Sequence, residues 1–227
     1  MNFHIITLFS GAFDSYIGES IIARAIREKK ISIKFYNPRD FVKKSERTGK
    51  DKNYAPVDKK PYGGGPGMVM EALPVARAIA KAKGSKRNVR IVFLSPSGAK
   101  FTTDIARSFA GIDQKAKKPK DLIIICGRYE GIDARVKKIF KMEEISIGDY
   151  VLTGGELPAL VILDCVARQI PGVLGNFDSR EESRVSSSEV YTRPEILEYK
   201  KKKYRVPKVL LSGNRAEIDK WRMETKN

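Results

Sequence analysis

The chain has 227 residues, a length that predicts one large domain or one domain with an appendage. Hydrophobic residues make up 41%, which is enough for a core and too much for a disordered chain. No apolar run approaches the roughly 18 residues that cross a bilayer, and the N-terminus lacks a basic signal-peptide region, so we expect a cytoplasmic protein. A net charge of +17 favours a polyanionic partner such as nucleic acid.

Strand-like and helix-like apolar patterns alternate along the chain. In chain order, we expect a strand at Phe3–Phe9, a helix over Phe13–Lys29, a strand at Ile31–Tyr36, a helix around Pro74–Ala82, a strand at Val89–Leu94, a helix capped by Thr102 and ending near Ala110, strands at Leu122–Cys126 and Glu143–Ile147, and a helix over Glu156–Gln169. The run Leu122–Cys126 is typical of a strand buried on both faces. This alternation predicts an α/β fold with a largely parallel sheet and ligands at the carboxyl ends of its strands.

The pattern changes after residue 176. Ser179–Ser188 is polar and almost without apolar residues, which predicts a flexible linker. Beyond it, Asn214 and Glu217 match a capping box that opens a helix through about Met223. We therefore expect a main domain over residues 1–176, a linker over 177–188 and a small helical domain over 189–227.

Histidine and cysteine usage excludes several chemistries. His4 is the only histidine, so Ser-His-Asp, Cys-His and histidine-metal sites are ruled out. Cys126 and Cys165 lie in apolar runs and are expected to be core residues of a reducing compartment, not zinc ligands. Acid–base catalysis must therefore come from carboxylates, lysine or tyrosine.

The basic residues are clustered. Lys43–Lys60 holds seven basic and three acidic residues, Lys115–Lys120 holds four basic and no acidic residues, and Lys200–Lys208 holds six basic and no acidic residues. One such run is as often a solvated loop as a binding site, but three in one chain favour nucleic acid. Nothing resembles a basic amphipathic membrane helix, so a membrane partner is not expected.

Glycines mark four loops. Pro61–Met68 lacks the Gly-Lys-Ser/Thr ending of a P-loop and does not directly follow a strand, so neither ATP nor NAD is supported, and a tight structural loop is as plausible as ligand contact. The other three loops, Ser95–Gly98, Gly127–Asp133 and Gly148–Pro158, each follow an expected strand. Together they predict a glycine-walled pocket that offers backbone hydrogen bonds and few charges. Such a pocket suits an adenine and a sulfonium amino acid better than a triphosphate.

These blocks, with Tyr191–Glu195 and Val209–Asn214, closely resemble the bacterial tRNA (guanine-N1)-methyltransferase family, TrmD. The resemblance runs from Phe3 to about Arg222. It implies a SPOUT-type parallel sheet with a deep trefoil knot, a homodimer whose active sites use residues of both subunits, and S-adenosylmethionine as cofactor. It places the cofactor against Leu94, Ser95, Pro96, Gly127, Tyr129, Glu130, Ile147, Gly148, Asp149, Tyr150, Val151, Leu152, Gly154, Gly155 and Pro158.

The resemblance also implies the reaction, methylation of N1 of the guanosine at position 37 of tRNA, on the 3′ side of the anticodon. That reaction needs a base for the N1 proton and stabilisation of charge on O6. Arg168 corresponds to the family's arginine for O6. The family's catalytic aspartate lies in the linker, where this chain has Glu182; Glu181 and Asp178 are alternative carboxylates. Family members use Mg²⁺, but no acidic cluster identifies a protein site for the ion.

Two further departures concern tRNA. Lys50–Pro56 lies within an insertion, and Lys59 stands where the family usually has the second of two aspartates. The chain ends at Asn227, before a helical segment by which the family grips tRNA, and Lys200–Lys203 could compensate as phosphate contacts. Three hypotheses follow: the tRNA methyltransferase, a SPOUT methyltransferase for another RNA guanosine, and a non-catalytic basic RNA-binding protein.

Overall fold

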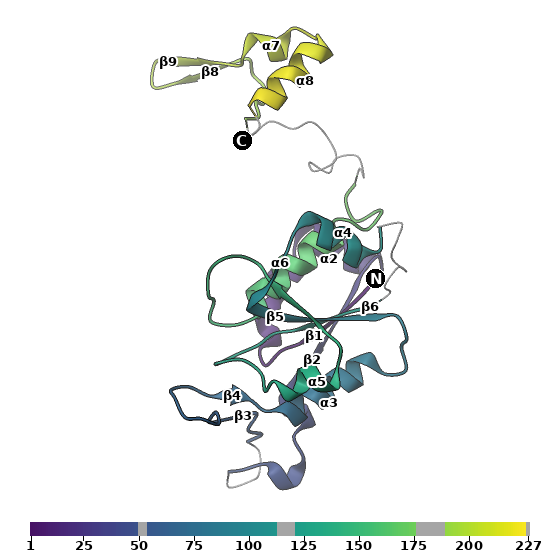
Figure 1. The fold of residues 1–227 in the computed structure, drawn as a ribbon. Coiled ribbons are helices and arrows are strands. Elements are labelled where there is room, and N and C mark those ends of the chain that lie inside the picture. Colours follow the sequence, from purple (N-terminus) through teal and green to yellow (C-terminus); the bar gives the residue numbers. More distant parts are fainter. Residues whose placement is uncertain (50–53, 113–120, 176–188, 226–227) are drawn as a thin grey trace. The chain divides into compact units, whose positions relative to one another are not determined.

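The computed structural model describes residues 1–49, 54–112, 121–175 and 189–225 (Figure 1). The chain divides into two compact units, Met1–Gly175 and Asn176–Asn227. The expected linker residues 177–188 and the basic run Lys115–Lys120 lie outside the described residues. None of the helices in the described part of the chain is long and apolar enough to span a membrane.

A five-stranded parallel sheet forms the centre of the first unit (Figure 1). Its strands, in the order β2-β1-β6-β5-β7, are β1 (Asn2–Ile6), β2 (Ser32–Tyr36), β5 (Val89–Lys100), β6 (Asp121–Ile125) and β7 (Glu143–Ser146). The predicted α/β class and parallel sheet are confirmed. Every residue of β6 is buried, as its unbroken apolar run predicted.

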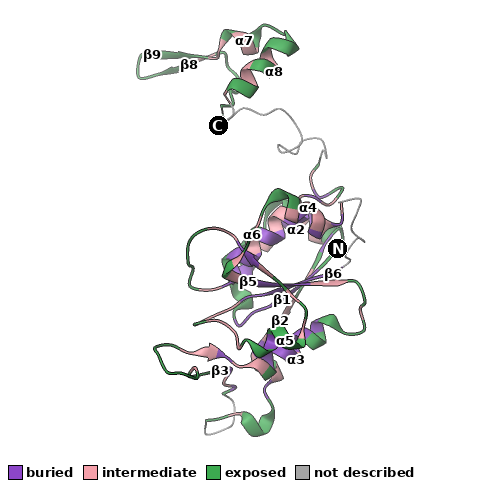
Figure 2. Ribbon diagram, viewed as in Figure 1, coloured by how far each residue is buried: buried purple, intermediate pink, exposed green. Residues whose placement is uncertain are grey.

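Helices cover both faces of this sheet, and Figure 2 shows buried residues along both interfaces. The helices are α1 (Asp14–Ile17), α2 (Ser20–Arg27), α3 (Ala72–Lys83), α4 (Thr103–Ala110), α5 (Arg135–Ile139) and α6 (Glu156–Ala167), with 3-10 turns η1 (Ser10–Phe13), η2 (Pro38–Phe41) and η3 (Lys44–Glu46). One core lies between the sheet and α2, α4 and α6, and the other lies between the sheet, α3 and α5. Alternate residues of β6 enter each core, Leu122 and Ile124 the first and Ile123 and Ile125 the second.

The expected helix over Phe13–Lys29 is interrupted. Gly18, a poor helix former, ends α1, and Glu19 is extended before α2 begins at Ser20. The hydrophobic spacing on both sides of the break kept the period of a helix, so the pattern alone predicted one element. The expected cap at Thr102 is confirmed, because its Oγ1 accepts a hydrogen bond of 3.3 Å from the backbone N–H of Ile105.

Strand β5 is longer than predicted and pairs with β7 twice. Ile145 of β7 lies opposite Leu94 and again opposite Ala99, with an irregular segment between them. Gly98 lies in that segment, and a Cβ there would lie 2.5 Å from the backbone nitrogen of Ile145. The chain therefore loops out and returns against the same strand, an approach that only glycine permits.

Two short hairpins were not predicted. In the first unit, β3 (Asp58–Lys59) pairs antiparallel with β4 (Val69–Met70), on either side of the glycine-rich loop. In the second unit, β8 (Ile196–Tyr199) pairs antiparallel with β9 (Lys202–Arg205), followed by α7 (Lys208–Leu211) and α8 (Arg215–Glu224). The predicted start of α8 is confirmed, since Asn214 Oδ1 accepts from the backbone N–H of Glu217 at 3.5 Å.

Candidate cofactor-binding site

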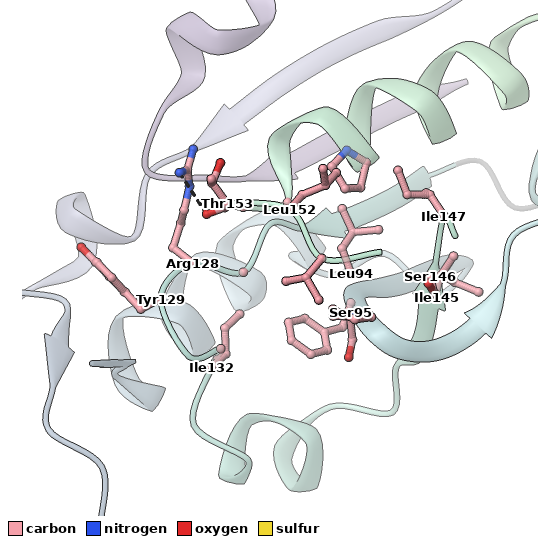
Figure 3. A pocket seen from close by; sticks show the side chains of 18 of the residues that line it. Leu94, Ser95, Arg128, Tyr129, Ile132, Ile145, Ser146, Ile147, Leu152 and Thr153 are labelled. Carbon is pink, nitrogen blue, oxygen red and sulfur yellow. Dashed lines mark hydrogen bonds between the residues drawn. The ribbon is translucent and has the colours of Figure 1, made fainter. Parts of the chain in front are cut away.

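A cavity of about 390 Å³ opens at the carboxyl ends of three adjacent strands, β6, β5 and β7 (Figure 3). Its walls are the end of β5 and the loop after it, the loop after β6, and the loop between β7 and α6. Because parallel strands end at one edge of a sheet, these three loops, far apart in sequence, meet at one place. The volume is in the range of small-molecule and cofactor sites.

Most of the residues expected to contact a cofactor line this cavity. They are Leu94, Ser95, Pro96, Gly127, Tyr129, Glu130, Ile147, Tyr150, Val151, Leu152, Gly154, Gly155 and Pro158. Gly148 and Asp149 are not among its lining residues. Asp149 Oδ2 accepts from Lys100 Nζ at 2.5 Å, and Ser146 Oγ donates to the carbonyl of Gly148 at 2.9 Å. These contacts hold both residues in a turn beside the cavity.

Gly127 and Gly155 join two of the walls, since Gly155 donates its N–H to the Gly127 carbonyl at 3.0 Å. A Cβ on Gly155 would lie 2.6 Å from the Cα of Cys126, so the residue is required for α6 to pack against the end of β6. A valine at this position would therefore disturb the packing of the fold itself, in addition to any effect on cofactor binding. At Gly127 a Cβ would reach only ordinary contact, 3.4 Å from the Phe93 ring, so that position tolerates a side chain without ligand.

Sequence reasoning missed eight lining residues: Phe93, Arg128, Gly131, Ile132, Lys137, Ile145, Ser146 and Thr153. Most lie inside the glycine blocks or at the ends of the strands, where neighbouring residues were predicted. Arg128 is a different case, because its position depends on Glu156, 28 residues later in the chain. The only indication of this contact in the sequence was that an arginine and a glutamate lie in neighbouring glycine blocks.

Arg128 pairs with the buried carboxylate of Glu156, with 2.8 Å between Nη2 and Oε2. Glu156, whose side chain is 4% exposed, also accepts a hydrogen bond of 2.7 Å from Thr7 Oγ1. The guanidinium lies over the Phe9 ring, 4.6 Å from its centroid, and donates to the Thr153 carbonyl at 3.3 Å. Arg128 thus connects the segment after β1, two loops of the cavity and the first turn of α6.

Tyr129 lies on the cavity wall with a backbone φ of 58°, a conformation that a tyrosine rarely adopts. Burial, with a smaller effect of the nearby Asp58 carboxylate, raises the pKa of its hydroxyl. The next residue, Glu130, is the only carboxylate among the described lining residues. The cavity therefore offers one negative side chain, together with the cationic side chains of Arg128 and Lys137, in a wall that otherwise consists of backbone, apolar and hydroxyl groups.

Comparison with known proteins identifies this architecture. The sequence model described as "tRNA (Guanine-1)-methyltransferase TrmD" matches residues 1–227. The chain belongs to this family. Three relatives carry the name tRNA (guanine-N(1)-)-methyltransferase. The Geobacter sulfurreducens protein is 44% identical over 99% of this chain and 85% of its own length. The Thermomicrobium roseum protein is 45% identical over 98% of this chain and 77% of its own length, and the Buchnera aphidicola protein is 42% identical over 98% of this chain and 88% of its own length. These names favour the first of the three hypotheses from the sequence.

In this TrmD-family chain, the glycine-rich loop lies beside the cavity and is not part of its lining. Gly67 approaches Glu130 so closely that a Cβ would lie 2.5 Å from the carboxylate oxygen, and Glu130 donates its N–H to the Met68 carbonyl at 2.9 Å. The loop braces the wall that carries Glu130. A Cβ on Gly63, Gly64 or Gly65 would meet nothing within 4 Å, so among the loop's four glycines only Gly67 makes such a close approach, and the two interpretations from the sequence both stay predictions.

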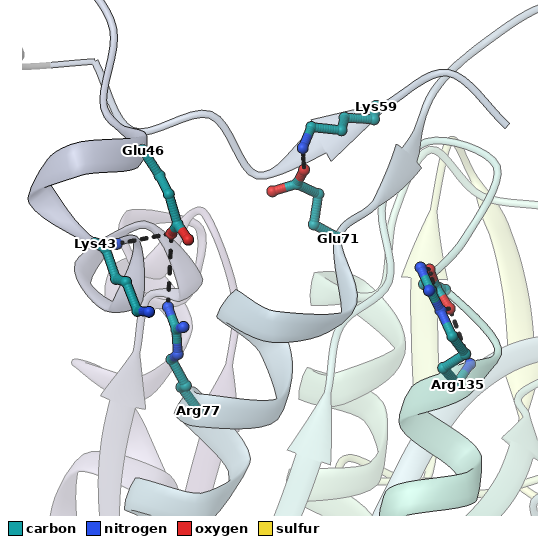
Figure 4. Close-up of polar contacts among 7 residues, drawn as sticks. Lys43, Glu46, Lys59, Glu71, Arg77 and Arg135 are labelled. Carbon is teal, nitrogen blue, oxygen red and sulfur yellow. Dashed lines mark hydrogen bonds and ion pairs between the residues drawn. The ribbon is translucent and has the colours of Figure 1, made fainter.

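Lys59, the departure from the family's pair of aspartates, forms an ion pair with Glu71 (Figure 4). Hydrogen bonding to that carboxylate raises the pKa of the lysine. The pair links β3 to the residue that precedes α3. Lys59 therefore has a structural partner within its own chain.

The expected catalytic residues lie elsewhere. Arg168 is the C-cap of α6, half-buried, and is not among the cavity's lining residues. Glu182, Glu181 and Asp178 lie outside the described residues. Among the residues that are described, no group of three or more His, Cys, Asp or Glu is placed to hold a metal ion. Burial raises the pKa of the Cys126 thiol, as expected of a core cysteine; Cys165 is only partly buried.

Proposed function

We propose that this protein transfers a methyl group from S-adenosylmethionine to N1 of guanosine 37 in tRNA, in the cytoplasm. The observation that carries the proposal is the three-loop cavity, found where the glycine blocks predicted it, in a chain of the TrmD family. The net charge of +17 suits a tRNA substrate.

The cavity fits such a cofactor in three respects. Backbone groups of the three loops can hydrogen-bond an adenine edge, as in many nucleotide sites. Leu94, Ile147, Leu152 and Pro158 supply apolar wall. Glu130 offers a carboxylate to the ligand's positive charge. When bound, S-adenosylmethionine would supply an electrophilic methyl group.

The protein's own task is to handle the proton and the charge of guanine. N1 carries a proton in the neutral base, so a carboxylate has to accept it; we propose Glu182, with Glu181 and Asp178 as alternatives. We propose that Arg168 stabilises the negative charge that develops on O6. A base within the anticodon loop must be splayed out to reach these groups.

The position of Arg168 supports a homodimeric site. Pro158 lines the cavity near the start of α6, and Arg168 follows ten residues later, about 15 Å along the helix at 1.5 Å per residue. An arginine at that distance does not reach the cavity of its own chain. We propose that it serves the cavity of the partner subunit.

The exposed side of α6 supplies a surface for this association. Leu157 and Val161 are 62% and 42% exposed, and with Asp164 and Arg168 they follow the spacing of one helix face. Tyr16 donates to Asp164 at 2.6 Å, which raises the pKa of the tyrosine to about 12. Exposed apolar side chains on a helix that is otherwise in the core are typical of an interface.

We further propose that the sheet contains the trefoil knot of the SPOUT class. The double pairing of β5 with β7 and the close approach of Gly98 to Ile145 are the contacts expected where a chain loops around a strand. The proposal also assigns residues 189–227 to tRNA binding, as a C-terminal domain joined through 177–188.

The test is incubation of the protein with unmodified tRNA and methyl-labelled S-adenosylmethionine, with and without Mg²⁺, followed by nucleoside analysis and position mapping. Label as 1-methylguanosine at position 37 supports the proposal. Label at another guanosine would contradict the proposal and identify a methyltransferase with a different substrate position. Binding of tRNA without any label would indicate a non-catalytic RNA-binding protein.

Substitutions identify the base. We expect Glu182→Gln to lower turnover by about 10²–10⁴-fold, since the amide cannot accept the N1 proton, with cofactor affinity nearly intact. Glu182→Asp should retain activity because it restores the family's residue. Single-turnover kinetics with calorimetry of cofactor binding measure both. Normal turnover in Glu182→Gln, or a loss confined to Glu181→Gln or Asp178→Asn, would reassign the base.

A further inference from the structure

The β8–β9 hairpin of the second unit has two unlike faces. Its register pairs Leu197 with Tyr204 and Tyr199 with Lys202, and directly paired residues of antiparallel strands share a face. The aromatic face therefore consists of Leu197, Tyr199, Lys202 and Tyr204. Leu197, Tyr199 and Tyr204 are between 52% and 59% exposed.

The other face, which we call the paired face, has its charges balanced. Lys203 Nζ lies 3.1 Å from Glu198 Oε1, and Arg205 Nη1 lies 3.9 Å from Glu195 Oε1. Glu198 and Lys203 are directly opposite each other across the two strands. Lys203 therefore has a carboxylate partner within the hairpin, although the sequence showed it as one of four equivalent lysines.

The remaining three lysines belong to the aromatic face and the turn. Lys200 and Lys201 form the two-residue turn, both with positive φ (49° and 62°), as a type I′ turn requires. Such turns favour asparagine and glycine. Lys200 Nζ lies 5.4 Å from the centroid of the Tyr199 ring. In the described part of the chain, no carboxylate forms an ion pair with Lys200, Lys201 or Lys202.

We propose that the aromatic face and turn of this hairpin bind unpaired nucleotides of the tRNA, with Tyr199 and Tyr204 stacking on bases and Lys200, Lys201 and Lys202 contacting phosphates. The inference rests on the proposed function, because tRNA is the RNA concerned. Exposed aromatic rings beside unneutralised lysines are the combination that binds single-stranded nucleic acid. The face carries positive charge without an acidic residue, which complements a phosphate backbone.

The test compares full-length variants binding to labelled, unmodified tRNA, at a series of salt concentrations. The triple variant Lys200→Ala, Lys201→Ala, Lys202→Ala should weaken binding and lower the slope of log affinity against log salt by about 0.7 for each lost phosphate contact. The double variant Glu198→Ala, Lys203→Ala removes both charges of the pair, is the matched control and should leave both nearly unchanged. An equal loss in this control would overturn the division between the faces.

A second pair of variants tests stacking separately from charge. Tyr204→Leu should weaken binding about 5- to 100-fold with an unchanged salt slope, because it removes a ring and no charge. Tyr204→Phe keeps the ring and should bind nearly as the original protein does. Equal affinity of Tyr204→Leu and Tyr204→Phe, with the hairpin intact by circular dichroism, would contradict a stacking role.

Methylation kinetics separate this inference from the proposed function. If the unaltered protein forms no 1-methylguanosine yet binds tRNA through the hairpin, the proposed function fails and the hairpin inference stands. If methylation is found, the hairpin variants should raise KM for tRNA more than they lower kcat. A normal KM in the triple variant would overturn the hairpin inference alone.

Discussion

The ion pair between Arg128 and Glu156 gives a quantitative test of how the cavity is held together. Glu156→Gln keeps the size of the side chain and an oxygen that accepts from Thr7, but removes the charge. The arginine left behind is 24% exposed and can turn toward water, so we expect a loss of about 1–2 kcal/mol of unfolding free energy.

Arg128→Met should cost more, because it leaves an unpaired carboxylate that is 4% exposed. Removing one partner of a buried pair costs about 3–5 kcal/mol, and the exposed edge of this pair favours the lower limit, about 3 kcal/mol. In the double variant neither charge remains. We therefore expect a loss of about 2–3 kcal/mol for the double variant, and a coupling free energy of about 2 kcal/mol.

Urea unfolding followed by far-UV circular dichroism measures the three losses, and cofactor calorimetry measures the effect on the site. Trp221, the single tryptophan, lies in the second unit. The urea midpoint of its fluorescence is therefore an internal control, which should be the same in all variants. Additive losses from the two single variants would mean that the pair contributes no coupling. The cavity walls would then be held by backbone hydrogen bonds and packing alone.

Two further predictions concern the first unit. Gly127→Val should abolish cofactor binding and leave the fold intact, because the added methyl groups enter the cavity, whereas Gly155→Val should destabilise the fold itself. Calorimetry measures cofactor binding and thermal unfolding measures stability. Equal melting temperatures of the two variants would refute the distinction. Burial lowers the pKa of His4 below 6.5 despite its hydrogen bond to Asp121, so the unfolded chain binds the proton more readily. Stability should therefore fall as pH drops below about 6.5, and His4→Gln should flatten that dependence in unfolding measurements made across pH 5–8; an unchanged slope would exclude His4 as its source.

The sheet and its helices were predictable because apolar periodicity records which side of each element is buried. The break at Gly18 was not, since the spacing of apolar residues continues on both sides of it. Both hairpins were missed for a related reason. Their strands of two and four residues are too short, and in β9 too rich in lysine, to show a period of two.

The site could be predicted as far as its loops and no further. Three glycine blocks after three strands meet because parallel strands end together, which requires no knowledge of side chains. The contact between Arg128 and Glu156 depends on how α6 packs, and nothing local in the sequence specifies it. The packing role of Gly155, which also lines the cavity, was missed for the same reason, since the Cys126 backbone that it meets follows β6.

The separation of Arg168 from the cavity along α6 leads to a prediction about the proposed dimer. If Arg168 serves the partner's cavity, a chain with a blocked cavity (Gly127→Val) and a chain without the arginine (Arg168→Ala) are each inactive as homodimers. A heterodimer of the two has one site with both defects and one site with neither. Random exchange of equal amounts yields half heterodimers, so about a quarter of the original activity per site should return on mixing. Differently tagged chains, co-expressed and purified through both tags, should retain about half. If activity is absent from purified heterodimers that bind cofactor, Arg168 and the cavity act within one chain or Arg168 is needed in both.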